Sequence, residues 1–173
     1  MTKGGYPYVI NPIGDGFPTV TKELLDEIAY NFEEMIDVDF DYVLAPEAMG
    51  IHIAAAYTMR TGKPFKVIRK RGYGLPGEIC VEKSTGYEST VRTFINDVKP
   101  GDRAVIVDDI ISTGGTMRPI VRALREAGVD IVMIAVVLNK SSDPGLPERD
   151  LGVPVRYMLS VSVEDGKPVI RDP

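Results

Sequence analysis

The stretch Val105-Ile-Val-Asp-Asp-Ile-Ile-Ser-Thr-Gly-Gly-Thr116 decides how this chain folds. It begins as an apolar, β-branched run typical of a buried strand, and it ends in a loop of small residues before a helical pattern that starts near Met117. Asp108 and Asp109 stand side by side where the apolar run ends. Adjacent carboxylates at such a place repel each other, and they are costly unless hydroxyl groups or a cation occupy the site.

The loop Thr113–Thr116 has the features of a phosphate-binding cradle. Gly114 and Gly115 leave backbone N–H groups unobstructed, the threonines offer hydroxyl donors, and the following helix presents the positive end of its dipole. The pattern is neither a Walker A loop nor the dinucleotide-binding Gly-x-Gly-x-x-Gly. A capped helix after a core strand would explain Thr113 and the glycines but not the two carboxylates. We therefore expect a phosphate site with a polyol- or metal-binding pair beside it.

Strand-like and helix-like patterns alternate along the rest of the chain. The expected strands are residues 42–45, 65–68, 104–107 and 131–138, and the expected helices are residues 21–36, 49–61 and 117–127. This alternation predicts an α/β fold with a central parallel β-sheet flanked by helices, in one domain over residues 1–173. Ligands of such sheets bind beyond the carboxyl ends of the strands, so the loops after the strands should converge on one site. These loops begin at Pro46, Arg69, Asp108 and Asn139.

Residues 72–92 fit neither the helical nor the strand period. The segment is rich in glycine and charged residues, with Tyr73 and Tyr87 among them. Polar insertions of this length in a compact domain are commonly functional lids, and the glycines favour a segment that rearranges and is not pinned to the core. The alternative is a solvent-exposed hairpin.

Composition excludes several classes of protein. The chain has 173 residues, of which 44% are hydrophobic and 26% charged, so it can bury a core and is neither disordered nor fibrous. Its net charge of −5 has the wrong sign for a protein that coats nucleic acid. No apolar run is long enough to cross a bilayer, and Met1–Asn11 lacks the pattern of a signal peptide. With one cysteine and one histidine there is no zinc cluster, and we expect a cytoplasmic protein.

The string from Val105 to Thr116 resembles the phosphoribosyl pyrophosphate signature of the type I phosphoribosyltransferases. The resemblance implies the fold of that family, a central parallel sheet flanked by helices with a flexible lid loop. In that family the acid pair contacts the ribose 2′ and 3′ hydroxyls, a role that falls here to Asp108 and Asp109. The loop holds the 5′-phosphate, and the matching residues are Ser112, Thr113, Gly114, Gly115 and Thr116.

Three further segments resemble parts of the adenine-type enzymes. Residues 46–50 lie where the family has its pyrophosphate loop, with Met49 in place of an arginine, so backbone N–H groups or cations from elsewhere would hold pyrophosphate. Residues 69–71 and 75–78 resemble the segments that lead into the mobile lid, and residues 83–88 fall where the lid carries Glu-Tyr. The resemblance thus implies substrate binding by Glu47, Ala48, Met49, Gly50, Arg69 and Lys70, and catalytic roles for Lys83 and Glu88 beside the two aspartates.

Among the subgroups, the strings Pro-Glu-Ala-Met-Gly and Tyr-Gly-Leu-Pro-Gly-Glu are most similar to the archaeal hypoxanthine/guanine phosphoribosyltransferases, which have the adenine-type scaffold. The similarity covers roughly Asp41 to Lys140. Ser112 departs from the aspartate and the alanine that the better-known hypoxanthine-guanine and adenine enzymes carry there. The purine base is therefore open, and the segment that covers it is expected in Tyr6–Phe17 or in the loop after Leu138.

The resemblance implies Mg²⁺-dependent transfer of 5-phosphoribosyl from phosphoribosyl pyrophosphate to hypoxanthine or guanine, giving IMP or GMP and pyrophosphate in purine salvage. Substrate oxygens would hold most of the Mg²⁺ coordination, with Asp108 and Asp109 taking part indirectly. Cations in residues 66–71 would stabilise the leaving group, and lid closure would exclude water. A homodimer is also implied. The alternatives are an adenine phosphoribosyltransferase and a non-catalytic regulator that senses phosphoribosyl pyrophosphate.

Three weaker candidates have simpler explanations. His52 follows the pyrophosphate loop and is interpreted as a satisfied, partly buried histidine, because nothing near it in sequence would orient it as a base. Cys80 has no accompanying histidine that would make it a nucleophile. The charges of Asp143–Asp150 indicate a solvated loop.

Overall fold

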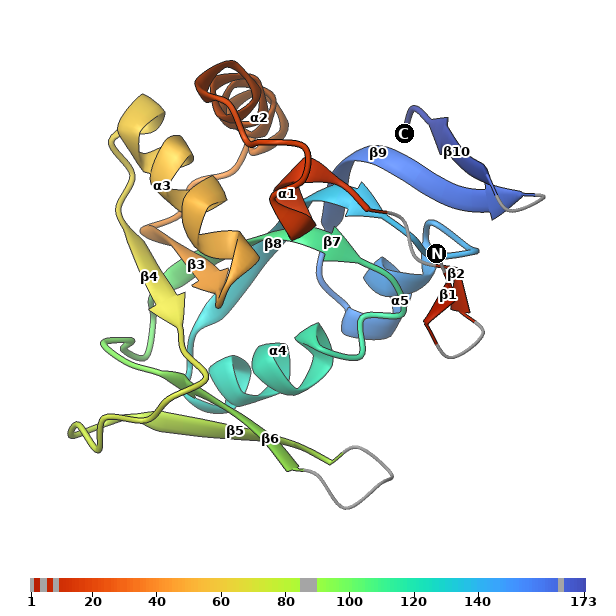
Figure 1. Cartoon of the computed structure of the whole chain (residues 1–173). Coiled ribbons are helices and arrows are strands. Elements are labelled where there is room, and N and C mark those ends of the chain that lie inside the picture. Colours follow the sequence, from red (N-terminus) through yellow and green to blue (C-terminus); the bar gives the residue numbers. More distant parts are fainter. Residues whose placement is uncertain (1, 4–5, 8–9, 85–89, 165–166) are drawn as a thin grey trace.

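The computed structural model describes residues 2–3, 6–7, 10–84, 90–164 and 167–173, and its centre is a six-stranded sheet (Figure 1). The strand order is β10-β9-β8-β7-β3-β4, and every neighbouring pair is parallel except β9 and β10. The strands are β3 (Tyr42–Pro46), β4 (Phe65–Ile68), β7 (Arg103–Ile111), β8 (Asp130–Asn139), β9 (Val155–Glu164) and β10 (Lys167–Arg171). The predicted α/β fold with a central parallel sheet is confirmed.

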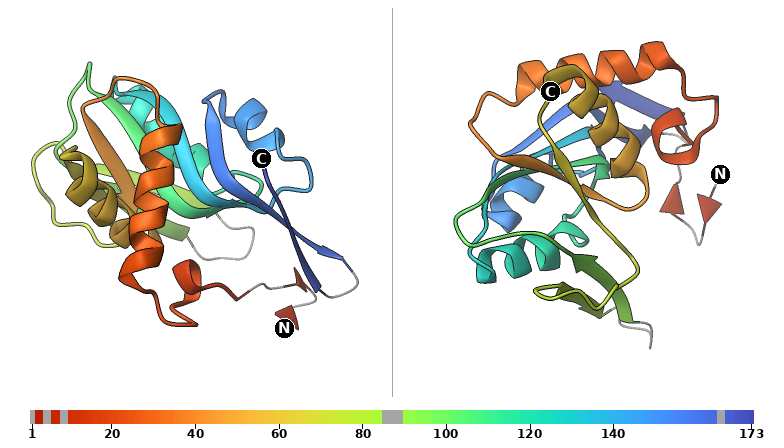
Figure 2. Two further views of the ribbon diagram at one scale, coloured as in Figure 1. Left: turned by 90° about the horizontal axis from the view of Figure 1, so that it is seen from above. Right: turned by 90° about the vertical axis from the view of Figure 1, so that its left-hand side faces the viewer.

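Helices cover both faces of this sheet. The helices α1 (Pro12–Asp15), α2 (Lys22–Met35) and α3 (Met49–Thr61) contribute to the core on one face, and α4 (Met117–Glu126) and α5 (Leu146–Leu151) to the core on the other. Figures 1 and 2 show α2 and α3 together on the side opposite α4. The predicted helices begin and end within a few residues of the expected positions. Thr21 caps α2 by accepting a hydrogen bond from Leu24 N at 3.3 Å.

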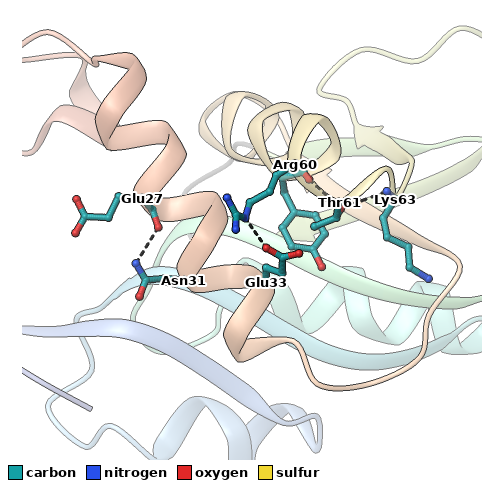
Figure 3. A network of polar contacts seen from close by, with 7 residues as sticks. Glu27, Asn31, Glu33, Arg60, Thr61 and Lys63 are labelled. Carbon is teal, nitrogen blue, oxygen red and sulfur yellow. Dashed lines mark hydrogen bonds and ion pairs between the residues drawn. The ribbon is translucent and has the colours of Figure 1, made fainter.

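Polar side chains form hydrogen bonds at the outer surface where α2 meets α3 (Figure 3). Arg60 donates a hydrogen bond to the carboxylate of Glu33 across the two helices. At the end of α3, Thr61 Oγ1 donates to Tyr57 O at 2.9 Å and accepts from Lys63 N at 3.2 Å. The Thr61 hydroxyl thus links the last turn of α3 to the residues that follow the helix.

Strand β7 is the centre of both cores. Its side chains alternate, so Ala104 and Ile106 enter the core beneath α4, while Val105 and Val107 enter the core beneath α2 and α3. All four are fully buried. A strand covered on both faces must be apolar at every position, which explains the continuous apolar run in the sequence.

The predicted end of this strand is wrong. The apolar run stops at Val107, but β7 continues through both aspartates, and Asp108 pairs with Val136 while Ile111 pairs with Asn139 of β8. A charged residue after an apolar run normally marks the end of a buried strand. Here the ladder with β8 fixes the backbone on either side of Asp109, so the carboxylates project from a rigid strand and not from a loop.

Residues 72–92 contribute to an antiparallel hairpin of β5 (Ile79–Ser84) and β6 (Thr90–Ile95). Val81 and Ile95 are buried in the core, and β5 contacts α4 (Figure 2, right). The expectation that nothing pins this segment to the core is therefore wrong at its base. The alternative, a solvent-exposed hairpin, describes the segment only in part, because one face of the base of the hairpin packs against the core. Residues 85–89, which include Tyr87 and Glu88, lie outside the described residues.

Two other segments differ from the expectations. The charged stretch Asp143–Asp150 is not only a solvated loop, since it runs into α5, where Pro147 and Leu151 are buried. The start of the chain holds the short paired strands β1 (Thr2–Lys3) and β2 (Tyr6–Pro7) before α1. None of the helices in the described part of the chain combines the length and apolar character that crossing a bilayer requires.

Replacing Ile95 by alanine tests the anchoring of the hairpin. Ile95 is fully buried, so Ile95→Ala should lower the free energy of unfolding by about 2–4 kcal/mol in urea titrations. Arg92→Ala, at an exposed position of the same strand, should change it by less than about 0.5 kcal/mol. Equal effects of the two variants would contradict the packed base.

Candidate active site

Loops from four parallel strands meet at the carboxyl edge of the sheet, as the alternating pattern predicted. A cleft of about 480 Å³ opens there. Its walls come from the end of β7, the loop before α4 and the residue after β8. The lining residues are Asp108, Ile110, Ile111, Ser112, Thr113, Gly114, Gly115, Thr116, Met117 and Lys140. The motif that decides the fold therefore also forms most of the cleft.

The two aspartates are held in a strained electrostatic state. Asp108 Oδ1 accepts a hydrogen bond from Asp109 N at 3.0 Å. Burial first, and then the charge of Asp109, raises the pKa of Asp108 to about 8, while the positive charge of Lys70 opposes that shift. Burial also raises the pKa of Asp109. A cation or a set of hydroxyl donors in the cleft would relieve this cost, as the sequence led us to expect.

His52, on α3, is close enough to this pair to respond to its charge. Burial lowers the pKa of His52, and the charge of Asp109 partly opposes the shift. Its Nε2 atom is buried and has no hydrogen-bond partner among the described residues. The interpretation of His52 as a satisfied histidine is therefore wrong, although its partly buried position was predicted correctly.

Glu47 joins two of the predicted loops. Its Oε2 accepts a hydrogen bond from Lys70 N at 3.0 Å and lies 3.4 Å from Arg69 Nε, while its own N–H donates to Ile68 O at 2.9 Å. The Glu47–Ala48 peptide is cis. The carboxylate of Glu47 thus holds the loop after β4 beside the loop after β3. This arrangement brings the cations of residues 69–70 to the edge where Asp108 lies.

Gly50 shows why α3 lies so close to the central strand. A Cβ atom at this position would be 2.8 Å from Val107 O, a backbone atom that cannot move aside. Only glycine permits this approach. The close contact sets residues 48–50, the start of α3, beside the end of β7.

The cradle loop leads directly into α4. Gly114 has a φ of 69°, a conformation that favours glycine, and it is buried against Leu151. Its carbonyl accepts a hydrogen bond from Arg118 N at 2.9 Å. Thr113 and Thr116 are exposed on the cleft side of the loop. The backbone and hydroxyl donors expected from the sequence are therefore gathered before the N-terminus of a ten-residue helix.

A second cleft of about 280 Å³ adjoins the first, because both are lined by Ser112, Thr113 and Lys140. Its other walls are the loop after β8 and one stretch of β9. The lining residues there are Ser141, Ser142, Leu146, Val161, Ser162 and Val163. The loop after Leu138 was one of the two segments expected to cover a base.

Lys140 is a site residue that the sequence analysis did not single out. Its backbone N–H donates to Ile111 O at 2.7 Å, which holds it against the end of β7. The available signal was its position, since it follows β8 at the same sheet edge as the aspartates. A lone lysine after an apolar strand is common, so only the fold shows that it borders both clefts.

The remaining predicted residues fall on the hairpin and the loop before it. Lys83 lies on β5 opposite Val91, and Glu88 is outside the described residues. Glu78 accepts hydrogen bonds of 2.9 Å from Tyr73 N, Gly74 N and Asn96 Nδ2, and these bonds lower its pKa. The Leu-Pro-Gly-Glu segment thus stabilises the loop before the hairpin.

No group of three or more histidine, cysteine, aspartate or glutamate side chains in the described ranges is spaced to hold a metal ion. Asp108 and Asp109 supply hard oxygen donors of the kind that Mg²⁺ prefers, but only two residues. The donor set therefore fits a cation whose other ligands come from a bound substrate or from water.

Comparisons with known proteins agree with this geometry. Residues 20–158 match the model of the phosphoribosyl transferase domain. The hypoxanthine/guanine phosphoribosyltransferase of Methanobacterium paludis is 44% identical over 99% of this chain and 90% of its own length. The corresponding protein of Methanothermobacter thermautotrophicus is 41% identical over 99% of this chain and 89% of its own.

Solved structures show the same architecture. Adenine phosphoribosyltransferase from Thermoanaerobacter pseudethanolicus superimposes with a TM-score of 0.67 at 26% identity, covering 80% of this chain and 81% of that one. The enzyme from Rhodothermus marinus gives the same TM-score and identity, covering 81% of each chain. With the acid pair, the cradle and a domain match over most of its length, this chain belongs to the phosphoribosyltransferase family of enzymes.

Proposed function

We propose that this enzyme transfers 5-phosphoribosyl from phosphoribosyl pyrophosphate to a ring nitrogen of hypoxanthine or guanine, as a purine salvage enzyme. The observation that carries the proposal is the pair of adjoining clefts. One is lined by Asp108 and the phosphate cradle, the other is lined by the loop after β8 and residues of β9, and Lys140 borders both. Relatives over 40% identical across nearly the whole chain are named hypoxanthine/guanine phosphoribosyltransferases.

The first cleft accommodates the phosphoribosyl group. Thr113–Thr116 hold the 5′-phosphate through backbone N–H groups and hydroxyls, assisted by the dipole of α4. Asp108 and Asp109 accept hydrogen bonds from the ribose hydroxyls and favour positive charge on the sugar as the bond to pyrophosphate breaks. The raised pKa values support this assignment, because the pair gains most from donors and positive charge.

The leaving group lies toward the loops after β3 and β4. Backbone N–H groups of Ala48–Gly50 and the cations of Arg69 and Lys70 face the negative charge that develops on pyrophosphate. Glu47 positions these loops through its bonds to Lys70 N and Arg69. Mg²⁺, held by substrate oxygens with indirect help from the aspartates, supplies further positive charge to the pyrophosphate.

The second cleft receives the purine, and Lys140 selects between purines. Its ammonium group is a hydrogen-bond donor only, so it suits the carbonyl oxygen at position 6 of hypoxanthine or guanine. Adenine carries an amino group at that position, which is itself a donor there. We further propose a Mg²⁺-dependent, cytoplasmic homodimer of one domain per chain, in which Lys83 and Glu88 take part in catalysis.

An assay with separate bases tests the proposal. The protein with phosphoribosyl pyrophosphate and Mg²⁺ should form nucleotide from hypoxanthine and guanine, at least about 10-fold faster than from adenine because an unpaired donor costs over 1 kcal/mol. Chelation of Mg²⁺ should stop the reaction. Chromatography of the nucleotide products measures both results. Preference for adenine would overturn the base assignment, and no nucleotide from any purine would overturn the function.

Replacing both aspartates by asparagine separates their catalytic role from folding. Asp108→Asn with Asp109→Asn should lower kcat/KM by about 100-fold or more, since charge facing the sugar is lost. Asp150→Asn, at an exposed position of α5 outside both clefts, serves as a control that should keep full activity. Near-normal kcat/KM in the double variant would contradict the assigned role.

The same double variant should show a pH-dependent gain in stability. The folded-state pKa of Asp108, about 8, lies above the ordinary value of about 4, so its ionisation destabilises the free protein as pH rises between these values. The asparagine variant should therefore match the native protein below about pH 4 and exceed its free energy of unfolding increasingly toward pH 8. Denaturant titrations at several pH values measure the difference, and a constant difference would contradict the buried ionisation.

Replacing Lys140 by methionine tests the base site. Lys140→Met keeps an unbranched side chain, one atom shorter, but removes the donor, so KM for hypoxanthine should rise about 10-fold or more, as expected for a lost charged hydrogen bond. Affinity for phosphoribosyl pyrophosphate should remain nearly unchanged. Lys22→Met, on the exposed face of α2, is the matched control. Equal losses for both substrates would place Lys140 outside the base site.

A further inference from the structure

The turn before α2 lies against the end of the central strand, outside residues 20–158 that the family model matches. It consists of the four-residue helix α1 and its caps, residues 11–16. Asn11 Oδ1 accepts a hydrogen bond from Gly14 N at 2.8 Å, and Asp15 Oδ2 accepts one from Asn11 N at 3.0 Å. Ile13 is buried in the core beneath α2 and α3. The turn is therefore fixed by reciprocal capping and by one apolar anchor.

Gly14 packs directly against the carboxylate of Asp109. A Cβ atom at position 14 would lie 2.7 Å from Asp109 Oδ2 and 3.1 Å from Asn11 Nδ2, which is closer than side chains approach. Asn11 cannot retreat without losing its bond to Gly14 N. Any side chain at position 14 must therefore displace either the carboxylate or the whole turn.

The carboxylate of Asp109 has little room to move elsewhere. Its backbone belongs to β7, and the pairing of Ile110 with Leu138 fixes the strand immediately after it. Asp108 precedes Asp109 on the chain and accepts a hydrogen bond from its backbone N–H. The charge of Asp109 acts on His52 of α3. The carboxylate thus lies between α1, α3 and Asp108.

We propose that the turn at residues 11–16 is a positioning element of the ribose site, and that Gly14 is required because only hydrogen leaves Asp109 its orientation toward the sugar. The proposal rests on the role of Asp109 in holding ribose. The proposal makes the ribose site depend on Gly14, a residue outside the motif at residues 105–116. The turn acts through Asp109 and does not itself contact the substrate.

A double-mutant cycle tests the coupling, with ribose 5-phosphate as the probe and no base present. Gly14→Ala should weaken binding of ribose 5-phosphate about 10-fold in calorimetry, because a displaced acceptor no longer meets the ribose hydroxyls. Asp109→Ala should weaken it as well. In the Asp109→Ala background the added methyl meets no carboxylate, so Gly14→Ala should cause no further loss.

Gly145→Ala is the matched control. It adds the same methyl where the close neighbour, at 2.8 Å, is Nη1 at the flexible end of Arg149, so affinity should not change. Thermal unfolding of each variant shows whether the fold is kept. A general folding defect from Gly14→Ala would persist when Asp109 is alanine, and this result would overturn the proposal.

Two further outcomes separate this inference from the proposed function. If Asp109→Ala weakens binding of ribose 5-phosphate and Gly14→Ala does not, the positioning role is overturned and the function stands. If the unsubstituted protein binds neither ribose 5-phosphate nor phosphoribosyl pyrophosphate, both are overturned. Loss with Gly14→Ala that disappears in the Asp109→Ala background supports the inference.

Discussion

Two carboxylates on consecutive residues of a strand buried on both faces set the condition that the rest of this site meets. Burial and the charge of Asp109 raise the pKa of Asp108, and the ladder with β8 fixes the backbone on both sides of Asp109. The fold carries this cost at the carboxyl edge of the sheet. Under the proposed function, the hydroxyl groups and positive charge of the sugar offset it, so the residues that serve the reaction are ones that lower the stability of the free protein.

Other elements hold groups around this pair through hydrogen bonds and close packing that take no part in the reaction. Glu47 fixes Lys70 N, and with it a positive charge that acts on Asp108. Gly50 lets α3 approach the carbonyl of Val107, and Gly14 lets the N-terminal turn reach Asp109. Three loops far apart in sequence thus converge because small or well-bonded residues remove the steric barrier to their approach.

Much of this arrangement follows from local pattern. Apolar runs and helical periods located β7, α4 and β8, and the parallel topology explained why Glu47 and Lys70 meet. The sequence pattern gave wrong predictions where contacts between residues far apart in the chain determine the structure. A polar pair normally ends a strand, yet β8 extends β7 beyond Asp109, and Val81 and Ile95 anchor a hairpin that lacks a clear period. The position of Lys140 after β8 is a weak signal until the fold places it beside both clefts, and Gly14 gains a role only when the fold places it against Asp109.

Among the described residues, the two clefts share Ser112, Thr113 and Lys140, and the outer walls of the second come from β9, the loop after β8 and Leu146. Residues 161–163 border no part of the first cleft. Substitutions on β9 can consequently reshape the second cleft while the walls of the first stay as they are. Under the proposed function, nucleobase preference would diverge on β9, apart from the residues that hold the phosphoribosyl group.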